Sequence, residues 1–170
     1  MNLQFNIALA VFSSALLGAG PAASKDTVDD SAATAAKFEF DHVSCKGAPN
    51  EIRIVVNHIK KSVGLITADL YRNDDESFLH KAGRQVRVRF AARAPLTRFC
   101  MTAPEAGEYA IAIYHDKNAN KKLDKGAFGI PSEPWGLSRN PRIRLRKPRV
   151  EEALIKVAPE GSKVEISLNN

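Results

Sequence analysis

The sequence predicts an all-β protein, an antiparallel β-sandwich of about seven or eight strands. In several short segments the apolar residues alternate with a period of two, which is typical of strands with one buried face. Gly, Pro and Asn residues separate these segments, and no stretch has the apolar periodicity of a helix. Short strands at regular spacing favour an immunoglobulin-like or transthyretin-like sandwich.

The first 36 residues are predicted to lie outside the folded domain. Residues 3–20 are uncharged and apolar and lead into small residues, so we expect residues 1–23 to be a signal peptide. An uncleaved membrane anchor is the alternative, although Ser and Gly interrupt the apolar run. Residues 24–36 are small and polar, which indicates a flexible leader, and one domain is expected over residues 37–170. We therefore expect a periplasmic or secreted protein with no transmembrane segment after signal cleavage.

Strands in the first half of this domain are predicted from apolar residues at every second position. Residues 84–90 are the clearest case, with Val and Phe on one face and Arg87 and Arg89 on the other. Residues 96–102 alternate less cleanly, which suits a strand covered on both sides. The remaining strands of this half are expected at Phe38–Phe40, Ile52–Val56 and Leu65–Leu70.

The segment Glu108–His115 is the strongest strand prediction in the chain. It is apolar on both faces and rich in aromatic and branched residues, so we expect a central strand. A turn is expected just before it, where Pro104 and Gly107 favour chain reversal. Later strands are expected around Ile143 and Leu145, over residues 153–157, and at Val164, Ile166 and Leu168.

The two cysteines, Cys45 and Cys100, are predicted to form a disulfide. An even pair of cysteines in a chain with an export signal favours a bridge, because exported proteins meet an oxidising compartment. Two buried free thiols are the alternative, since sequence does not give the distance between the two residues.

A polar loop follows the predicted central strand and has the spacing of a calcium-binding loop. Oxygen-bearing side chains occupy positions 1, 3, 5 and 9 of the segment Asp116–Asp124, and position 7 can supply a carbonyl oxygen. Calcium loops of the EF-hand type draw oxygen ligands from these positions. Glu133 is the nearby carboxylate that could fold back to complete the shell. The candidate ligands are Asp116, Asn118, Asn120, the Lys122 carbonyl, Asp124 and Glu133.

Two departures from the EF-hand pattern predict that any calcium site here is weak. Lys121 stands where the sharp turn favours Gly, and Ala127 stands where a bidentate Glu is usual. Four lysines, Lys117, Lys121, Lys122 and the adjacent Lys125, outnumber the two aspartates of the segment, and affinity follows ligand charge. The alternative is that Asp and Asn side chains bind their own backbone in Asx turns without a metal. A zinc site is not expected, because the histidines are scattered and His115 is interpreted as a hydrogen bonder at a strand end.

The same region resembles the signature of a known family of exported bacterial proteins, domain-of-unknown-function family 2141. The motif runs from Gly107 through Asn120, continues at Leu123-Asp124, and ends with the segment Gly129–Ser138. The resemblance covers about residues 52–168 and implies a secreted or periplasmic β-sandwich with no established activity. Family members usually have an Asn-Gly step where this chain has Asn120-Lys121, which puts a positive-φ turn there in doubt. As candidate ligands the resemblance carries over Asp116, Asn118, Asn120, Asp124 and Glu133.

Positive charge is concentrated in two arginine-rich segments. The net charge is +6, and residues 139–149 hold six basic residues and no acid. If the two segments lay in one sheet, their arginines would form a cationic face for lipopolysaccharide, anionic lipid or another polyanion of the cell envelope. A solvated sheet face is the alternative, and nucleic acid is not expected because no aromatic residues interleave the arginines. The residues of this face are Arg87, Arg89, Arg142, Arg144 and Arg146.

No motif of an enzyme is present, so we expect a non-enzymatic protein. The chain has no Gly-x-Ser-x-Gly elbow and no Gly-rich phosphate loop. A hydrolase that uses Glu133 with Asp116 or Asp124 is one alternative. Trp135 could stack on a sugar or could plug one end of the sandwich. The leading interpretation is an exported binding or structural module whose loop is ordered by weak calcium binding or by Asx turns, and the second is a polyanion-binding envelope protein.

Overall fold

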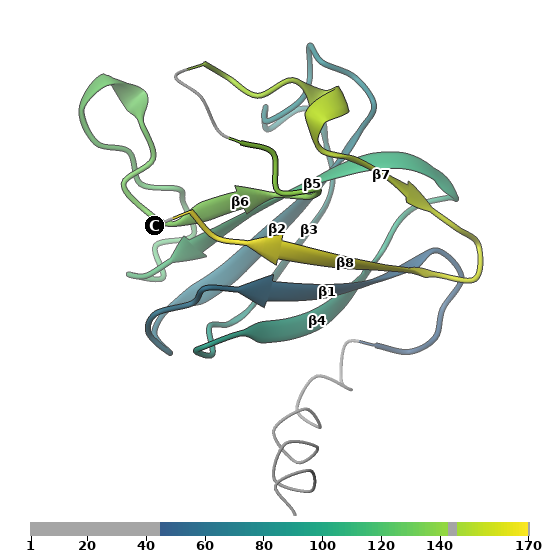
Figure 1. The fold of residues 1–170 in the computed structure, drawn as a ribbon, viewed down its shortest axis with the longest axis horizontal. Coiled ribbons are helices and arrows are strands. Elements are labelled where there is room, and N and C mark those ends of the chain that lie inside the picture. Colours follow the sequence, from purple (N-terminus) through teal and green to yellow (C-terminus); the bar gives the residue numbers. More distant parts are fainter. Residues whose placement is uncertain (1–44, 143–145, 170) are drawn as a thin grey trace, which may run out of the picture.

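The computed structural model describes residues 45–142 and 146–169, which form two β-sheets packed face to face (Figure 1). The three-stranded sheet has the order β4 (Thr97–Thr102), β1 (Glu51–Asn57) and β8 (Ser162–Ser167). The five-stranded sheet has the order β3 (Arg84–Ala91), β2 (Leu65–Arg72), β5 (Gly107–Asp116) and β6 (Trp135–Leu137), and β7 (Leu154–Val157) also pairs with β5. Two 3-10 turns, η2 (Ala127–Gly129) and η3 (Val150–Glu152), complete the described part. The predicted all-β sandwich is confirmed, while the immunoglobulin-like or transthyretin-like type stays a prediction.

Most of the predicted strands are present at the predicted places. The segment interpreted as central is β5, which pairs with β2 along its length and with β6 and β7 on its other side. Strand β6 was not predicted, because it is only three residues long. The predicted strands at Phe38–Phe40 and around Ile143 and Leu145 lie outside the described residues, as do the predicted signal peptide and leader.

One strand pairing of the sandwich departs from the antiparallel pattern. Strands β1 and β8 run parallel, with Ile54 opposite Val164. Parallel neighbours need a long connection between them. Here that connection includes all the strands from β2 to β7, so the last strand of the chain returns beside the first.

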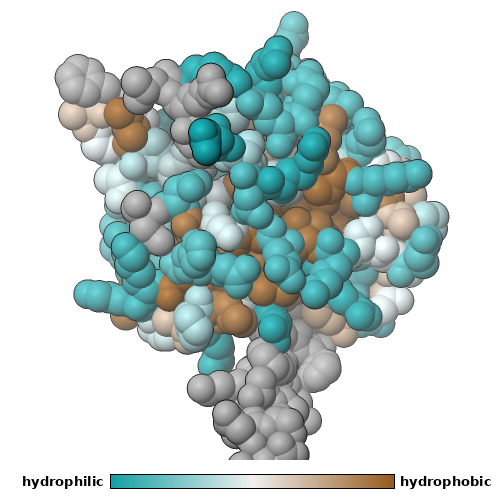
Figure 2. Space-filling model, viewed as in Figure 1, coloured by the Kyte–Doolittle hydropathy of each residue, from teal (hydrophilic) through white to brown (hydrophobic). Residues whose placement is uncertain are grey.

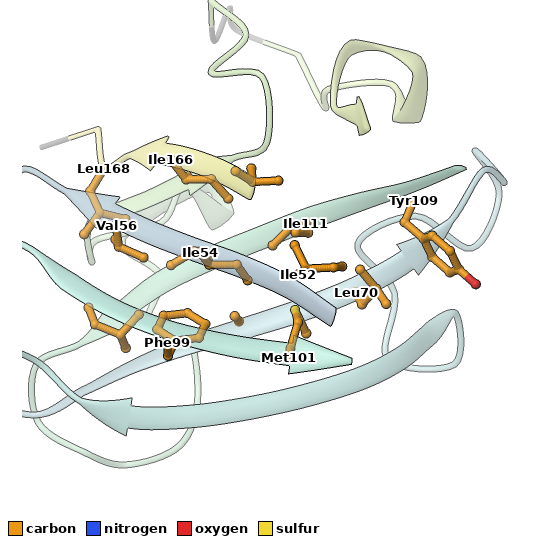
Figure 3. Packing of buried hydrophobic residues seen from close by; sticks show 14 of the residues in the cluster. Ile52, Ile54, Val56, Leu70, Phe99, Met101, Tyr109, Ile111, Ile166 and Leu168 are labelled. Atoms are coloured by element: carbon orange, nitrogen blue, oxygen red, sulfur yellow. The ribbon is translucent and has the colours of Figure 1, made fainter. Parts of the chain in front are cut away.

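The main core lies between the two sheets and is built from the alternating apolar residues (Figure 3). Ile52, Ile54 and Val56 of β1 point from the three-stranded sheet toward Leu70 and Ile111 of the other sheet. All five of these side chains are buried, which removes their apolar surface from water and drives the sheets together. Val86, Val88 and Phe90 of β3 also pack on this core, as the alternation predicts.

A second, smaller apolar cluster lies on the opposite face of the five-stranded sheet, which we call its outer face. Tyr71 and Ala110 contribute from the sheet itself, and Phe78 and Val150 come from the segments that cover it. The backbone N–H of Val150 donates to Asp75 at 2.8 Å, which joins the two covering segments. The cluster covers part of the outer face, and Asp69 and Arg87 lie beside it on the same face.

The disulfide between Cys45 and Cys100 is formed, which confirms that prediction. It ties the chain just before β1 to β4, where Cys100 is buried. Such bridges are more typical of extracellular proteins than of cytosolic ones. Within the described residues no helix is long and apolar enough to span a membrane. The surface turned toward the viewer in Figure 2 carries many hydrophilic side chains with smaller apolar areas between them.

Candidate functional site

The loop predicted from its ligand spacing begins where β5 ends, at a fully buried residue. Asp116 has 0% of its surface exposed, and the chain returns to the sheet at β6. The connection before β2 lies directly against this point, because a Cβ on Gly64 would be 2.0 Å from the Asp116 carbonyl oxygen. His115 Nε2 lies 2.7 Å from the Val63 carbonyl oxygen, a strand-end hydrogen bond as predicted. The start of the loop is therefore held by two neighbouring strands.

Asx turns shape the first half of the loop. The Asp116 carboxylate accepts the N–H groups of Asn120 at 3.0 Å and Lys121 at 2.7 Å. Asn118 Oδ1 accepts the N–H of Asn120, and Asn120 Oδ1 accepts the N–H of Lys122. These side chains satisfy backbone donors that would otherwise need water. The loop is thus ordered by hydrogen bonds of its own.

Glu133 joins the two ends of the loop. It is 6% exposed, and its carboxylate accepts the N–H of Lys117 at 2.8 Å and the N–H of Asp124 at 3.1 Å. The Asp124 carboxylate in turn accepts the side-chain amides of Asn118 and Asn120 at 2.7 and 2.9 Å. The expectation that Glu133 folds back on the loop is met by these contacts.

The backbone keeps a positive-φ turn although this chain has no Gly there. Lys121 has φ 65° and Ala119 has φ 56°, both in the left-handed region. For a residue with a Cβ, this conformation is less favourable by about 1–2 kcal/mol than the right-handed one. The hydrogen bonds from Asn120 and Lys121 to Asp116 offset this cost and hold the turn.

Lys121→Gly is expected to raise the free energy of unfolding by about 0.5–1 kcal/mol, because relief of left-handed strain exceeds the entropy cost of Gly. Lys122→Gly is the matched control, since Lys122 does not have a positive φ. It should lower stability by a similar amount. Urea unfolding of both variants measures the difference, and equal destabilisation by both would show that the turn at Lys121 is not strained.

The candidate ligands share the loop, but their three carboxylates do not gather within 4.8 Å of one another. Each of their side-chain oxygens accepts an N–H group in the structure. Among the described residues, the acidic, His and Cys side chains that gather within 4.8 Å in a group of three are Cys45, Glu51 and Cys100, and their sulfurs form the disulfide. The carboxylates of Asp116, Asp124 and Glu133 do not form such a group. A calcium ion would therefore have to draw them together and share them with backbone donors.

A cleft of about 1040 Å³ lies on the outer face of the five-stranded sheet, beside this loop. Its floor comes from the sheet, and the loop lines it with Lys121, Lys122, Leu123, Lys125 and the segment Gly129 to Pro131. Asp69 is the one acid among the described residues that line it. The lining is therefore strongly positive, which attracts anions. Its basic residues are Lys81, Arg84, Arg87, Lys121, Lys122, Lys125, Arg146 and Lys147.

Two arginines share the single carboxylate of Asp69 in the cleft. Arg87 donates from Nε to Oδ1 and from Nη2 to Oδ2, both at 2.6 Å, so it occupies both oxygens. Arg84 Nε lies 2.9 Å from Oδ1, but its N–H is not directed at that oxygen. The side chains of Arg84 and Arg87 are 19% and 21% exposed, and that of Asp69 is 7% exposed. One positive charge is left uncompensated in a largely buried place, where unpaired charge is costly.

Tyr71, which also lines the cleft, does not supply the missing negative charge. Burial raises the pKa of Tyr71, with Asp69 adding to the rise and Arg84 and Arg87 opposing it. Tyr71 therefore stays a neutral phenol at physiological pH. The hydrogen bond to Asp69 raises the pKa of Arg87 further, so that guanidinium stays charged.

The opposite side of the cleft is apolar and aromatic. Tyr114 and Trp135 are paired across β5 and β6, and Ile130 on the rim is 59% exposed. The Tyr114 hydroxyl is buried and finds no hydrogen-bond partner in the described part of the chain. Trp135 lies on the outer face of the five-stranded sheet rather than between the sheets. A buried hydroxyl without a hydrogen-bond partner, next to an uncompensated positive charge, is an arrangement that a functional role explains.

The predicted arginine face is only partly assembled. Arg87 and Arg146 line the same cleft, but each pairs with an acid, Arg146 with Glu152 at 2.8 Å. Arg89 and Arg142 are exposed, and Arg144 lies outside the described residues. Sequence reasoning missed Asp69, Arg84 and the three loop lysines as parts of one site. Asp69 itself was a signal, because an acid in an apolar strand needs a partner when it is buried.

The fold and the site together define a class: a disulfide-linked all-β sandwich whose central strand carries a hydrogen-bonded loop beside a basic cleft. Comparison with protein families identifies the family within this class. Residues 54–166 match the model of the family described as "Uncharacterized protein conserved in bacteria (DUF2141)", and the chain belongs to that family. No curated protein and no solved structure matches the chain.

Proposed function

We propose that this protein is a non-enzymatic module that binds an anionic ligand in the basic cleft on the outer face of the five-stranded sheet. The observation that carries the proposal is the sharing of Asp69 by Arg84 and Arg87, which leaves one largely buried positive charge without a counterion. A bound anion would supply the missing charge and gain from the low local dielectric.

The lysines of the loop extend this site toward solvent. Lys121, Lys122 and Lys125 line the cleft on the loop side, and Lys81 and Lys147 line it elsewhere. Clustered like charges in a cleft raise the local concentration of ligands with the opposite charge. The disulfide supports an exported protein, for which anionic components of the cell envelope, such as lipopolysaccharide or anionic lipid, are natural ligands.

The carboxylates near the cleft support binding rather than catalysis. Asp69 has both oxygens engaged by Arg87, so it is poorly placed to accept a proton from a substrate. Both oxygens of Glu133 accept backbone N–H groups that hold the loop. A structural role for Glu133 therefore explains its contacts better than the alternative of a hydrolase.

Retention on a heparin column tests the proposal with two variants of equal charge change. Replacing Lys121, Lys122 and Lys125 with Glu reverses the loop side of the cleft, and replacing Lys46, Lys156 and Lys163 with Glu reverses exposed lysines elsewhere. The first variant is expected to elute at much lower salt than the second, because its changes lie at the site. Retention of the unmodified protein should fall steeply as salt rises. Equal elution of the two variants would mean that only net charge matters.

A weak calcium brace in the loop is the second candidate, favoured by the spacing of Asp116, Asn118 and Asn120 and by the return of Glu133. Calcium at ten times its dissociation constant would add about 1.4 kcal/mol to stability. We expect millimolar calcium to raise the melting temperature of the unmodified protein by a few degrees and to have no effect on Asp124→Ala. The absence of any shift at 10 mM calcium, about ten times the dissociation constant of the weakest extracellular calcium sites, would remove the metal and leave the Asx turns alone.

A further inference from the structure

We propose that the ligand of the cleft is an anionic amphiphile, a molecule with one acidic headgroup and an apolar chain. This inference rests on the proposed anion site and adds the chemical class of the ligand. The acidic headgroup would sit at Arg84 and Arg87, and the apolar chain would lie across the sheet toward Trp135.

The strand register places the charged and apolar parts of the cleft side by side. Asp69 of β2 is opposite Arg87 of β3 on one side and Ala112 of β5 on the other. One step along the same face, Tyr114 is opposite Trp135 of β6. With strands about 4.8 Å apart and about 3.3 Å per residue, Trp135 lies on the order of 10 Å from Asp69. A ligand of modest length would reach both.

Ala112 forms the low point between these two parts. It is half-buried, lines the cleft and points to the outer face with Ala110. Its neighbours across the strands are Asp69 and Leu137, both larger residues. A methyl side chain between these larger neighbours leaves a trough in the floor, and the alkyl chain of the proposed ligand would lie over it.

The apolar walls favour a chain rather than a purely polar anion. Leu79, Leu123, Pro131 and Trp135 line the cleft, and the exposed side chain of Ile130 stands at its rim. Small-molecule sites are mainly apolar with a few polar groups that fix orientation. A polyanion would use the lysines and leave these walls in contact with water, whereas a neutral apolar ligand would leave the charge of Arg84 uncompensated.

Trp135 provides a direct measurement, because it is the only tryptophan in the chain and lines the cleft. Its fluorescence is followed while the protein is titrated with dodecanoate below its critical micelle concentration. Butyrate has the same headgroup without the long chain, and decanol has the chain without the charge. We expect a blue shift and an affinity for dodecanoate at least about 100-fold above that for either control, because several buried methylene groups and one charge contact add together. Dodecyl phosphate in parallel decides between a carboxylate and a phosphate headgroup.

Two variants separate the amphiphile from the anion site. Ala112→Leu fills the trough and should weaken dodecanoate binding at least tenfold. Ala91→Leu, at an exposed position of β3, is the control and should leave dodecanoate binding unchanged. If Ala112→Leu does not fold, Ile130→Ser gives the same test at an exposed position and should also weaken dodecanoate. Arg84→Gln should weaken dodecanoate but leave decanol unchanged.

The outcomes distinguish this inference from the proposed function. Equal affinities for butyrate and dodecanoate would overturn the amphiphile, and so would equal affinities for decanol and dodecanoate. If heparin retention still depended on the three loop lysines, the anion site would stand in either case. If heparin retention did not depend on those lysines, the proposed anion site itself would be overturned.

Discussion

Asp69→Asn is expected to lower the free energy of unfolding by about 3 kcal/mol, the cost of leaving a buried partner of an ion pair alone. Asn has the shape of Asp, so packing is preserved and the change acts through charge. Without the carboxylate, Arg84 and Arg87 face each other as two largely buried like charges. Chemical denaturation of the variant beside the unmodified protein measures the loss.

Arg84→Gln is the matched control for this prediction. It removes the surplus charge and keeps the bidentate pair between Arg87 and Asp69, so stability should change by less than about 1 kcal/mol. Added sulfate should restore part of the stability of Asp69→Asn, because an anion can take the place of the carboxylate. A loss below 1 kcal/mol for Asp69→Asn would show that the two arginines reach water and need no counterion.

Removal of the disulfide is expected to cost about 4 kcal/mol. Cys45 and Cys100 are 55 residues apart, and a bridge that closes a loop of this length removes that much conformational freedom from the unfolded chain in the chain-entropy model. The double variant Cys45→Ala/Cys100→Ala should therefore unfold at much lower denaturant than the unmodified protein.

The unmodified protein in excess dithiothreitol is the control, because reduction breaks the bridge without changing a side chain. Its loss should match that of the double variant to within about 1 kcal/mol, the cost of truncating a small buried side chain. Glu51 accepts the N–H groups of Lys46 and Gly47 and should keep the chain before β1 in place in both samples. A loss of less than 1 kcal/mol in both would mean that the unfolded chain already holds the two segments together.

The strands could be predicted because their signal is local. Alternating apolar residues located the segments that became β1 and β3, and β5 was located and identified as central because it is apolar on both faces and rich in aromatic and branched residues. The parallel pairing of β1 with β8 could not be predicted in this way, because it joins the two ends of the domain. Strand β6 was missed because three residues are too few to show a period.

The same division holds for the site. The loop was found because Asp116, Asn118 and Asn120 lie two residues apart and bind backbone groups within the loop itself. The cleft was not found, because Asp69, Arg84 and Trp135 stand on three different strands and meet only through the sheet register. Arg87 and Arg89 lie on the outer face of β3, opposite its apolar residues, as predicted. The partner acid, Asp69, lies on the neighbouring strand β2, and the sequence does not give the pairing of these two strands.

Glu133 preorganises one wall of the cleft for ligand binding. By holding the backbone at Lys117 and Asp124, it fixes the loop wall before any ligand arrives. A preorganised wall loses little conformational entropy on binding, so more of the contact energy remains as affinity. The backbone is held by Asp116, Asn120 and Glu133, whereas the charge comes from the lysines. Substituting those lysines would therefore retune the ligand preference of the cleft while its shape stays the same.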